Sequence, residues 1–391
     1  MPTIMPVPDL HLLLPFALPS AADAATALHG LESAALDKLL ARATLEERVI
    51  GEDFQRTLPH ERWIAQRFGI VAREPGQRHA DDAPLAPFML LADGGDPASS
   101  GTSGPSGTSG TALWACIEPV HVRIAHDHLV LIDPATLGVR TEEARELLKT
   151  ARPVIEDLGI ALQAPTPLRW YVSGDALGAL AGASPLRAAG RNIEIWLPHE
   201  ARTGERSRPW MKLQNEVQMA WFEHPLNVER ESRGLPAINS IWLHGQGAMR
   251  PVTSPFARVM SDAAATRGLA LAAGLAPTTP PESFSALAND SANGSANGSA
   301  NGNGNAQGAT LVELNPFSAP FIEQDWARWN AALLALETAW FAPALDALSN
   351  GSLRRLSLTL CGDTGSVTLS VTRGDLRKFW RRRPLAALLI E

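Results

Sequence analysis

The sequence predicts an α/β protein with a central, mostly parallel sheet flanked by helices, plus a smaller inserted α+β domain. Short apolar runs alternate with amphipathic helical segments toward both ends of the 391-residue chain, as in α/β folds. Between them, residues 112–200 alternate apolar and polar positions like antiparallel strands. We expect core segments at 1–92, 201–276 and 309–391, with residues 112–200 as the inserted domain.

Composition narrows the classes of function. The formal net charge of −7 argues against general nucleic-acid binding. The two cysteines, Cys116 and Cys361, predict neither a disulfide framework nor a thiolate metal cluster, and they make the reducing cytoplasm the expected location.

Residues 10–18 imitate a signal peptide, but they read better as a buried first strand. The first basic residue is Lys38, and Pro15 and Pro19 interrupt the apolar run. No apolar segment is expected to reach the roughly 20 residues that span a bilayer. We therefore expect no membrane association.

Two segments, 93–111 and 277–308, have the composition of disordered inserts. The first is built almost entirely of Gly, Ser, Thr, Pro and Asp, and the second repeats Ser-Ala-Asn-Gly three times. Such segments bury too little apolar surface to offset their ordering entropy.

Periodicity predicts the remaining elements. Helices are expected at 28–42, 57–69, from Thr141 as N-cap to about 151, and at 213–221, 260–273, 326–348 and 375–389. Strands are expected on either side of a turn at His126-Asp127 within 114–132, and at 168–172, 192–197, 238–243, 310–314, 355–363 and 367–371.

The stretch 213–256 is the most informative part of the chain. Its helix is expected to end at His224-Pro225, because a residue before proline avoids the α region. A polar connector, 227–233, leads to the strand 238–243 and then to the loop Gly245-Gln246-Gly247. Ligands of open α/β sheets bind beyond the carboxyl ends of the strands, so this loop is the first candidate site.

The same stretch resembles a known family. His224-Pro225-Leu226-Asn227-Val228-Glu229-Arg230, Gly234-Leu235-Pro236-Ala237-Ile238-Asn239 and Leu243-His244-Gly245-Gln246-Gly247 with Pro251 are similar to the "HPVN-x-x-R … G-x-x-P-A-N … L-x-G-x-G … P" stretch of cofactor-independent phosphoglycerate mutases, archaeal-type branch. Segments 31–39 and 132–144 resemble that family in the same order. The resemblance implies an alkaline-phosphatase-like core with 112–200 as the inserted domain.

The positions that carry the family's chemistry differ. The turn that should hold a serine nucleophile reads Pro59-His60-Glu61-Arg62, and the first strand, which should end in a metal-binding Asp-Gly, reads Leu14-Pro15-Phe16-Ala17. The later ligand regions read Leu314-Asn315-Pro316-Phe317-Ser318-Ala319 and Gly362-Asp363-Thr364-Gly365. Phosphoryl transfer at serine needs metal charge on both oxygens, so we predict that the two-metal site is absent. The chain also resembles the degenerate proteobacterial members of the family, which are described as regulators.

Several candidate residues keep two interpretations. His60, Glu61 and Asp363 are weak catalytic candidates, the first two being otherwise a solvated pair at a helix cap. The expected ligand-binding set is Asn227, Arg230, Asn239, His244, Gly245, Gly247 and Arg250. It forms either an anion site or a tight turn beside a surface connector.

Two further groups invite functional interpretations that we weigh lower. His121, His126, Asp127 and His128 form either a metal or acid–base site or a polar hairpin turn, and the turn is favoured. The arginines between Arg377 and Arg383 are expected to line a docked terminal helix rather than a nucleic-acid or membrane surface.

The sequence thus predicts a cytoplasmic, catalytically degenerate phosphoglycerate-mutase-like protein that acts as a regulatory or ligand-binding protein. We expect no metal or other cofactor. The expected partner is a phosphorylated small molecule or another protein, and neither nucleic acid nor a membrane. The alternative is an active mutase or phosphotransferase with a rebuilt site, for which Mn²⁺ or Mg²⁺ would be the cofactor.

Overall fold

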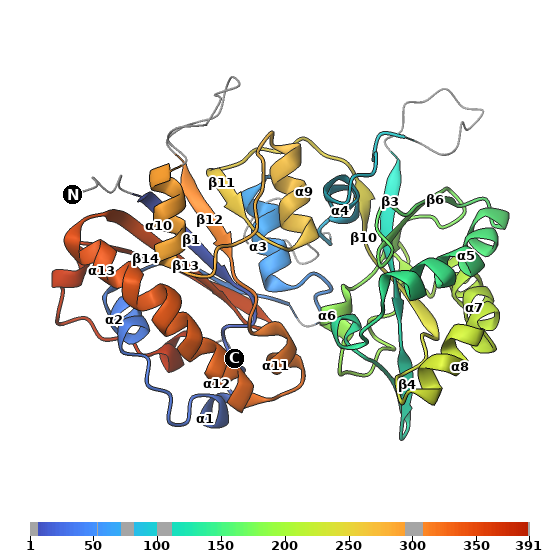
Figure 1. The fold of residues 1–391 in the computed structure, drawn as a ribbon, viewed down its shortest axis with the longest axis horizontal. Helices are drawn as coiled ribbons and strands as arrows, with labels where there is room; N and C mark the ends of the chain where they lie inside the picture. Colours follow the sequence, from blue (N-terminus) through green and yellow to red (C-terminus); the bar gives the residue numbers. More distant parts are fainter. Residues whose placement is uncertain (1–6, 53, 72–81, 100–111, 294–307, 390–391) are drawn as a thin grey trace. The chain divides into compact units, whose positions relative to one another are not determined.

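A computed structural model of the chain describes residues 7–52, 54–71, 82–99, 112–293 and 308–389. The chain divides into two compact units (Figure 1). Unit 1 contains Met1–Asp53, Thr253–Ala263 and Ala273–Glu391, and unit 2 contains Phe54–Val252 and Ala264–Ala272. Residues 54–92 and 201–252 thus group with 112–200 in unit 2. The reason is local: β10 (Ser240–Ala248) pairs with β3 (Leu113–Val120), and α4 (Ala86–Ala92) packs on both strands.

Unit 1 is an α/β layer. Its strands are β1 (Val7–Leu14), β2 (Thr44–Ile50), β11 (Phe256–Met260), β12 (Ala309–Glu313), β13 (Leu353–Cys361) and β14 (Gly365–Thr372). Its α-helices are α1 (Ala24–Ala27), α2 (Ala34–Arg42), α10 (Phe284–Asn293), α11 (Ser318–Ile322), α12 (Trp326–Leu336) and α13 (Ala342–Asn350).

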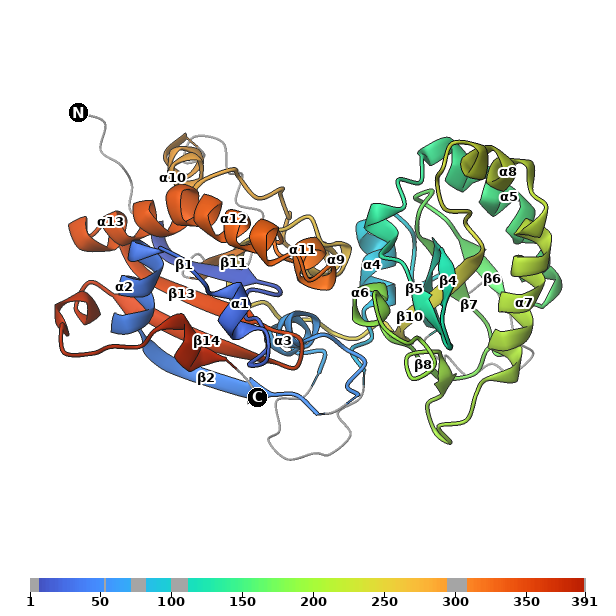
Figure 2. The same ribbon diagram turned by 90° about the horizontal axis from the view of Figure 1, so that it is seen from below.

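The six strands of unit 1 form one sheet in the order β11-β12-β1-β13-β14-β2. The first four are parallel, and β14 and β2 continue the sheet antiparallel. The first strand expected from 10–18 is therefore confirmed, and it lies inside the sheet with Leu12 and Leu13 fully buried. The expected mostly parallel sheet flanked by helices is confirmed as well (Figure 2).

A continuous helical run, Trp326–Asn350, joins α12 and α13 through the π-helical turn Glu337–Phe341. The turn directs Glu337 toward the start of α2, where its carboxylate accepts hydrogen bonds from the backbone N–H groups of Ala35 (2.5 Å) and Leu36 (3.0 Å). By length and composition, this helical run is long and apolar enough to cross a membrane. The expectation that the chain has no such segment is therefore wrong. Core helices of soluble proteins pass the same test, and 44% of its apolar window is buried.

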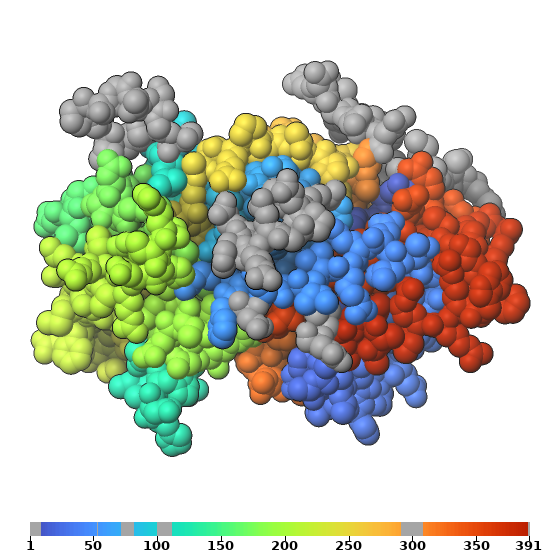
Figure 3. All heavy atoms as spheres, turned by 180° about the vertical axis from the view of Figure 1, so that it is seen from behind, coloured from blue at the N-terminus to red at the C-terminus, as the bar shows by residue number. Residues whose placement is uncertain are grey.

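The C-terminal segment is not the amphipathic helix predicted for 375–389. It contains two short 3-10 turns, Asp375–Arg377 and Leu385–Leu388, with a further turn at 379–380 and irregular chain between them. The guanidinium of Arg42 donates hydrogen bonds to the carbonyl oxygens of Phe379 and Arg381. In a helix these carbonyl oxygens would accept hydrogen bonds from the helix backbone, so the contacts with Arg42 favour a non-helical chain. Figure 3 shows this red C-terminal part beside blue N-terminal residues, as the pairing of β14 with β2 requires.

Unit 2 is built around an antiparallel sheet. Its strands are β3 (Leu113–Val120), β4 (Val122–Ala125), β5 (His128–Leu131), β6 (Ala161–Gln163), β7 (Trp170–Ser173), β8 (Leu180–Ala181), β9 (His199–Glu200) and β10 (Ser240–Ala248). Its helices are α3 (Pro59–Arg67), α4 (Ala86–Ala92), a 3-10 turn (Pro134–Thr136), α5 (Thr141–Asp157), α6 (Pro185–Ala188), α7 (Arg208–Phe222), α8 (Pro225–Ser232) and α9 (Ala264–Ala272).

The main sheet of unit 2 has the order β10-β3-β7-β6, with every neighbouring pair antiparallel. One face is apolar: Ala115, Ile117 and Leu243 belong to a buried cluster that also contains Trp210 and Trp221 of α7. On the other face Cys116, Glu118 and His244 point toward the side covered by α4, since successive side chains alternate across a strand. These three polar side chains therefore share one sheet face.

The helix α8 replaces the predicted connector at 227–233. Proline after His224 ends α7, but it also provides the first residue of α8, a position that favours proline. His224 caps the new helix, since its Nδ1 accepts a hydrogen bond from the backbone N–H of Leu226 at 3.2 Å. The helix α7 does end before Pro225, as predicted, but another helix begins at that proline.

Of three further predicted elements, the hairpin turn and the helix from Thr141 are confirmed, and the strand at 192–197 is wrong. The hairpin turn at His126-Asp127 joins β4 to β5 as predicted. The predicted strand at 192–197 is a series of turns, in which Ile193 and Trp196 are buried against the core. The helix expected from Thr141 is confirmed, with Arg140 in the N-cap position.

The two predicted inserts are partly ordered. Residues 284–293 of the second form α10, while 294–307 lie outside the described residues. In the first, Gln163 Nε2 donates a hydrogen bond to the carbonyl oxygen of Asp96 at 2.8 Å, and residues 100–111 lie outside the described range.

Candidate functional site

Three residues of the predicted ligand-binding set, Asn227, Asn239 and Arg230, form hydrogen bonds to other residues of unit 2. Asn227 Nδ2 donates to the carbonyl oxygens of Trp221 (3.0 Å) and Ile238 (2.9 Å), and its Oδ1 accepts from the Ile238 N–H. Asn239 pairs with both backbone groups of Val122, at 2.8 Å each. The Asn239 amide joins backbone segments that are 117 residues apart, whereas the Asn227 amide bonds backbone groups 6 and 11 residues away.

Arg230 is fully buried and has a partner for each terminal nitrogen. Its Nε donates to the carbonyl oxygen of Pro236 (2.9 Å), its Nη2 to that of Leu137 (2.7 Å), and its Nη1 to Glu143 Oε2 (2.9 Å). Burial would raise the pKa of Glu143, but hydrogen bonds from Arg140 and the charge of Arg230 lower it. The side chain thus ties α8 to the start of α5.

The Gly245-Gln246-Gly247 segment is part of β10 rather than a loop beyond a strand, which corrects the prediction. The pairing with β3 is irregular between His244 and Gly247, and Gly245 has a positive φ of 65°. A Cβ on Gly247 would lie 2.1 Å from Pro84 Cβ, and one on Gly245 would lie 3.2 Å from the Ala86 nitrogen. The close approach that requires these glycines is made by the chain before α4.

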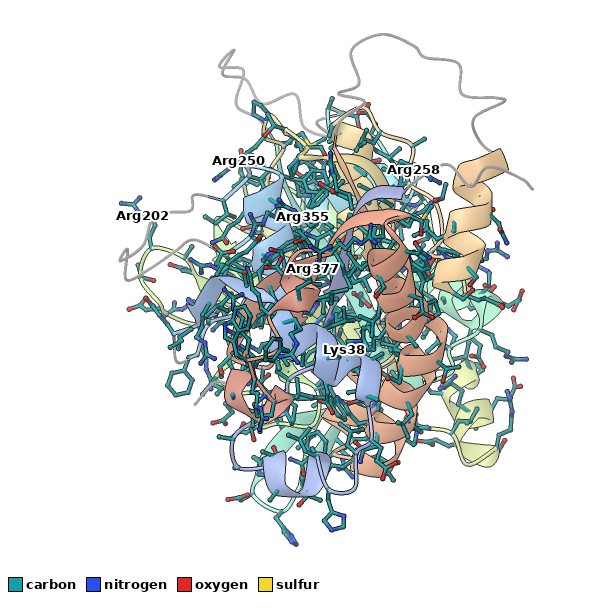
Figure 4. All side chains as sticks on the ribbon, turned by 90° about the vertical axis from the view of Figure 1, so that its left-hand side faces the viewer. Lys38, Arg202, Arg250, Arg258, Arg355 and Arg377 are labelled. Carbon is teal, nitrogen blue, oxygen red and sulfur yellow. The ribbon has the colours of Figure 1, made fainter. Side chains whose placement is uncertain are left out.

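The last cation of the set, Arg250, follows β10 and is exposed (Figure 4). Its Nη1 donates a hydrogen bond to the carbonyl oxygen of Ile70 at 3.1 Å. Arg250 is therefore the member of the predicted set that presents charge to solvent.

His244 belongs to a group of three potential metal ligands. Cys116, Glu118 and His244 each place one ligand atom within 4.8 Å of the other two. His244 lies 2.9 Å from Glu118 through Nε2 and Oε1, and its side chain is 7% exposed. Two of these residues, Cys116 and Glu118, were missed. Their spacing of two along a strand, which puts both side chains on one face, was the available signal.

A second polar group adjoins the cysteine. Arg169 binds Asp93 through Nε (2.9 Å) and Nη2 (2.6 Å), and the Tyr171 hydroxyl donates to Asp93 Oδ2 at 2.5 Å. Burial raises the pKa of the Cys116 thiol well above its ordinary value, and Glu118 and Asp93 act in the same direction. In the absence of another positive charge, Cys116 is a thiol at neutral pH.

His60 and Glu61 lie at the start of α3. Glu61 Oε2 accepts a hydrogen bond from the Leu58 N–H at 2.7 Å, which makes it a helix-capping residue. Burial raises its pKa, although the Leu58 bond and the charges of His244 and Arg187 oppose the shift. Burial, helped by Arg187, lowers the pKa of His60 to about 3, so His60 is neutral at physiological pH.

Asp363 is in unit 1 and follows β13, so it does not share a compact unit with His60 and Glu61. The strand ends around it are crowded. Phe16 lies two residues after β1, and its ring centroid lies 5.0 Å from that of Phe321. Phe317 and Trp329 pack 5.1 Å apart, and the Trp329 indole donates to the Phe16 carbonyl at 2.9 Å. Aromatic side chains thus occupy the region where α/β sheets usually bind ligands.

Polar groups at these strand ends are paired with one another. The Ser261 hydroxyl donates to Glu313 Oε2 at 2.6 Å, and Ser318 hydrogen-bonds to Asn315. Among the described residues, three close metal-ligating side chains occur together in unit 2, as Cys116, Glu118 and His244. No such group is found among the described residues at the parallel strand ends of unit 1.

The other histidine-rich segment has ordinary structural partners. His121 Nδ1 lies 2.6 Å from the carbonyl oxygen of Ala237, and His128 Nδ1 lies 2.8 Å from Asp127 Oδ1 at the exposed hairpin turn. His126 has a positive φ of 36° in that turn. These contacts agree with the polar-turn interpretation.

No protein-family description and no curated protein sequence matches the chain. Among solved structures, the PH0037 protein from Pyrococcus horikoshii matches 98% of this chain and 93% of its own, with a TM-score of 0.52 and 12% identity. A cofactor-independent phosphoglycerate mutase from Thermoplasma acidophilum DSM 1728 is aligned over 98% of this chain and 95% of its own, with a TM-score of 0.39 and 13% identity. The chain therefore shares its fold with the Pyrococcus protein over nearly its whole length.

Proposed function

We propose that the chain is a phosphoglycerate-mutase-like protein without two-metal serine chemistry, which acts in the cytoplasm by binding a ligand or partner. The sequence resemblance from His224 to Pro251 supports the family assignment. The aromatic contacts of Phe16, Phe317, Phe321 and Trp329 at the parallel strand ends support the loss of chemistry. This packing is the single observation on which the proposal depends most.

The physical reason is the coordination that the chemistry needs. Hard divalent ions require several oxygen or imidazole ligands that converge on one point. After β1 the chain offers Phe16, Ala17 and Leu18, all buried and apolar, and after β12 it offers Leu314 and Phe317. Glu313 is already the acceptor for Ser261. Two metal ions would have to displace a packed aromatic cluster.

His60 does not supply a replacement nucleophile under this proposal. It is buried, and burial is the largest cause of its low pKa, with the positive charge of Arg187 acting in the same direction. A phosphorylated imidazole would have to bury a bulky charged group at that position. The capping bond of Glu61 likewise gives that carboxylate a structural role.

The activity test uses the full chain. Mutase turnover of 3-phosphoglycerate and phosphatase turnover of a phosphate ester are measured with Mn²⁺, with Mg²⁺ and with a chelator. The expected result is no turnover above background in any condition. Mn²⁺-dependent turnover that the chelator abolishes would overturn the proposal, and turnover lost in His60→Ala with an unchanged thermal transition would instead establish a rebuilt site.

The binding test uses thermal unfolding with 3-phosphoglycerate and inorganic phosphate as probes. A ligand that binds the folded chain stabilises it by about 2.7 kcal/mol at a hundredfold excess over Kd. Arg250→Ala should reduce the stabilisation, and the exposed Arg202→Ala in the same unit is the matched control (Figure 4). No stabilisation by either probe would reject phosphate binding and leave a protein partner as the ligand.

A further inference from the structure

Cys116, Glu118 and His244 come together through the register of two antiparallel strands. His244 of β10 is directly opposite Cys116 of β3, and Glu118 is two residues along β3. Side chains at such positions point to the same face of the sheet. The register therefore places one sulfur, one carboxylate and one imidazole side by side on rigid elements rather than on loops.

We propose that these three residues form a binding site for Zn²⁺ or a similar borderline-soft divalent ion. Thiolate, imidazole and carboxylate are the protein ligands that zinc takes, at roughly 2.3 Å from sulfur and about 2.0–2.2 Å from nitrogen or oxygen. Ligand atoms around a tetrahedral zinc ion are therefore about 3.3–3.8 Å apart. The observed ligand atoms lie within 4.8 Å of one another, and those of His244 and Glu118 are already 2.9 Å apart.

Charge favours an ion at this position. Cys116 is fully buried, its sulfur lies within 4.8 Å of the Glu118 ligand atom, and Asp93 contacts the neighbouring Tyr171. A bound dication compensates such negative charge, and a coordinating thiol is deprotonated outright. One thiolate, one carboxylate and a neutral imidazole together neutralise the two positive charges, and Asp93 already neutralises Arg169.

The surroundings would hold the site in shape. The Tyr171 ring is opposite Cys116 on β7, and its hydroxyl is fixed by Asp93. Metal ligands commonly depend on such outer partners for their orientation. Three protein ligands leave a fourth tetrahedral position for water or another small ligand, as in open zinc sites.

The competing explanation is a structural ion pair between His244 and Glu118, with Cys116 as a small apolar side chain. Free cysteine often has that role in protein interiors. The two explanations differ in whether the Cys116 thiol coordinates a metal ion, so the test measures coordination by that sulfur. It is independent of the proposed loss of chemistry in unit 1, since these residues belong to unit 2.

The experiment uses Co²⁺ as a spectroscopic substitute for Zn²⁺. The full chain is unfolded, reduced, and refolded with one equivalent of Co²⁺, because a buried site is loaded most readily during folding. The expected result is a thiolate-to-cobalt charge-transfer band with tetrahedral d–d bands, which Zn²⁺ abolishes by displacement. Refolded native protein that has neither feature would overturn the proposal.

The chain provides a matched control, since Cys361 is its only other cysteine and is also fully buried. Cys116→Ser should remove the charge-transfer band and weaken Zn²⁺ binding by about 100-fold or more, because even lost outer partners cost 10–100-fold. Cys361→Ser should leave both unchanged. A band that survives in Cys116→Ser, or that disappears in Cys361→Ser, contradicts the assignment.

Folding of the variants is monitored separately. If Cys116→Ser does not refold, His244→Gln and Glu118→Gln test the same site while leaving the thiol in place. Each is expected to keep the near-UV circular dichroism of the native chain and to shift or weaken the cobalt spectrum. An unchanged spectrum in both variants would exclude the site.

Discussion

Arg230 and Glu143 form a buried ion pair, with Nη1 2.9 Å from Oε2 and side chains that are 0% and 4% exposed. The arginine belongs to the stretch that resembles phosphoglycerate mutases, where it is a candidate ligand for phosphate. Its three nitrogens instead bind Glu143 and two backbone carbonyls. A residue that is conspicuous in the sequence therefore has a structural role in joining α8 to α5.

The first prediction concerns this pair. Arg230→Met should lower the free energy of unfolding by about 3–5 kcal/mol, because it breaks a buried ion pair and also removes the donor to the carbonyl oxygens of Pro236 and Leu137, although Arg140 still bonds to Glu143. Arg233→Met is the matched control, since Arg233 Nη1 lies 3.7 Å from the same carboxylate and its side chain is 43% exposed. Urea denaturation should give a loss below about 1 kcal/mol for the control. Equal losses would contradict a structural role specific to Arg230.

The second prediction concerns Gly247. An added Cβ would lie 2.1 Å from Pro84 Cβ, so the chain before α4 must move. Gly247→Ala should destabilise unit 2 by about 1–3 kcal/mol, as overpacked interiors do. Gly374→Ala is the control, since its nearest atom would be Thr372 Oγ1 at an ordinary 3.7 Å. The thermal unfolding temperature should fall further for Gly247→Ala than for Gly374→Ala. Similar temperatures would contradict the prediction, because they would show that the Pro84 segment moves without loss of stability.

The sequence predicted secondary structure well where one periodicity dominates. The apolar runs that became β1, β12 and β13 could be assigned as buried strands, and the parallel sheet followed from their alternation with helices. The assignment failed where tertiary contacts decide. The turns at 192–197 have an apolar strand-like pattern because Ile193 and Trp196 are buried by the fold around them.

The candidate site was harder to predict for a related reason. The residues of the predicted ligand set were chosen for their types, but a buried Asn or Arg satisfies backbone groups as readily as it binds a ligand. Asn227 and Asn239 do the former. Cys116 and Glu118 were missed because their partner is 126 residues from Glu118 along the chain, and only the β3–β10 register brings His244 to them.

The third prediction is a pH dependence from His60. Its folded pKa is about 3, whereas an unfolded histidine titrates near 6.5. Between these values the unfolded chain binds a proton that the folded chain does not, so the free energy of unfolding falls as the pH drops from about 6.5. His60→Gln should remove this contribution, and denaturation midpoints at pH 7, 6 and 5 measure it. The exposed His29→Gln is the control, and an identical pH dependence in wild type and His60→Gln would refute the assignment.

The last prediction concerns Phe16, which lies in the turn two residues after β1 and has a positive φ of 55° and a fully buried ring. That backbone region costs an L-residue about 1–2 kcal/mol relative to glycine. The ring contacts with Phe321 must offset this cost, since the residue is retained at a strand end where glycine would fit the backbone better.

Both Phe16→Ala and Phe16→Gly should lose about 3–5 kcal/mol, because each leaves a cavity in the aromatic cluster. Glycine relieves the backbone, so Phe16→Gly should be the more stable of the two by about 1 kcal/mol. At Phe321, within α11, the order should reverse, because glycine destabilises a helix relative to alanine. Urea denaturation of the four variants gives two differences of opposite sign. If alanine is the better residue at both positions, the left-handed backbone at Phe16 is not what the native chain adopts, and the aromatic packing at this strand end must be arranged differently.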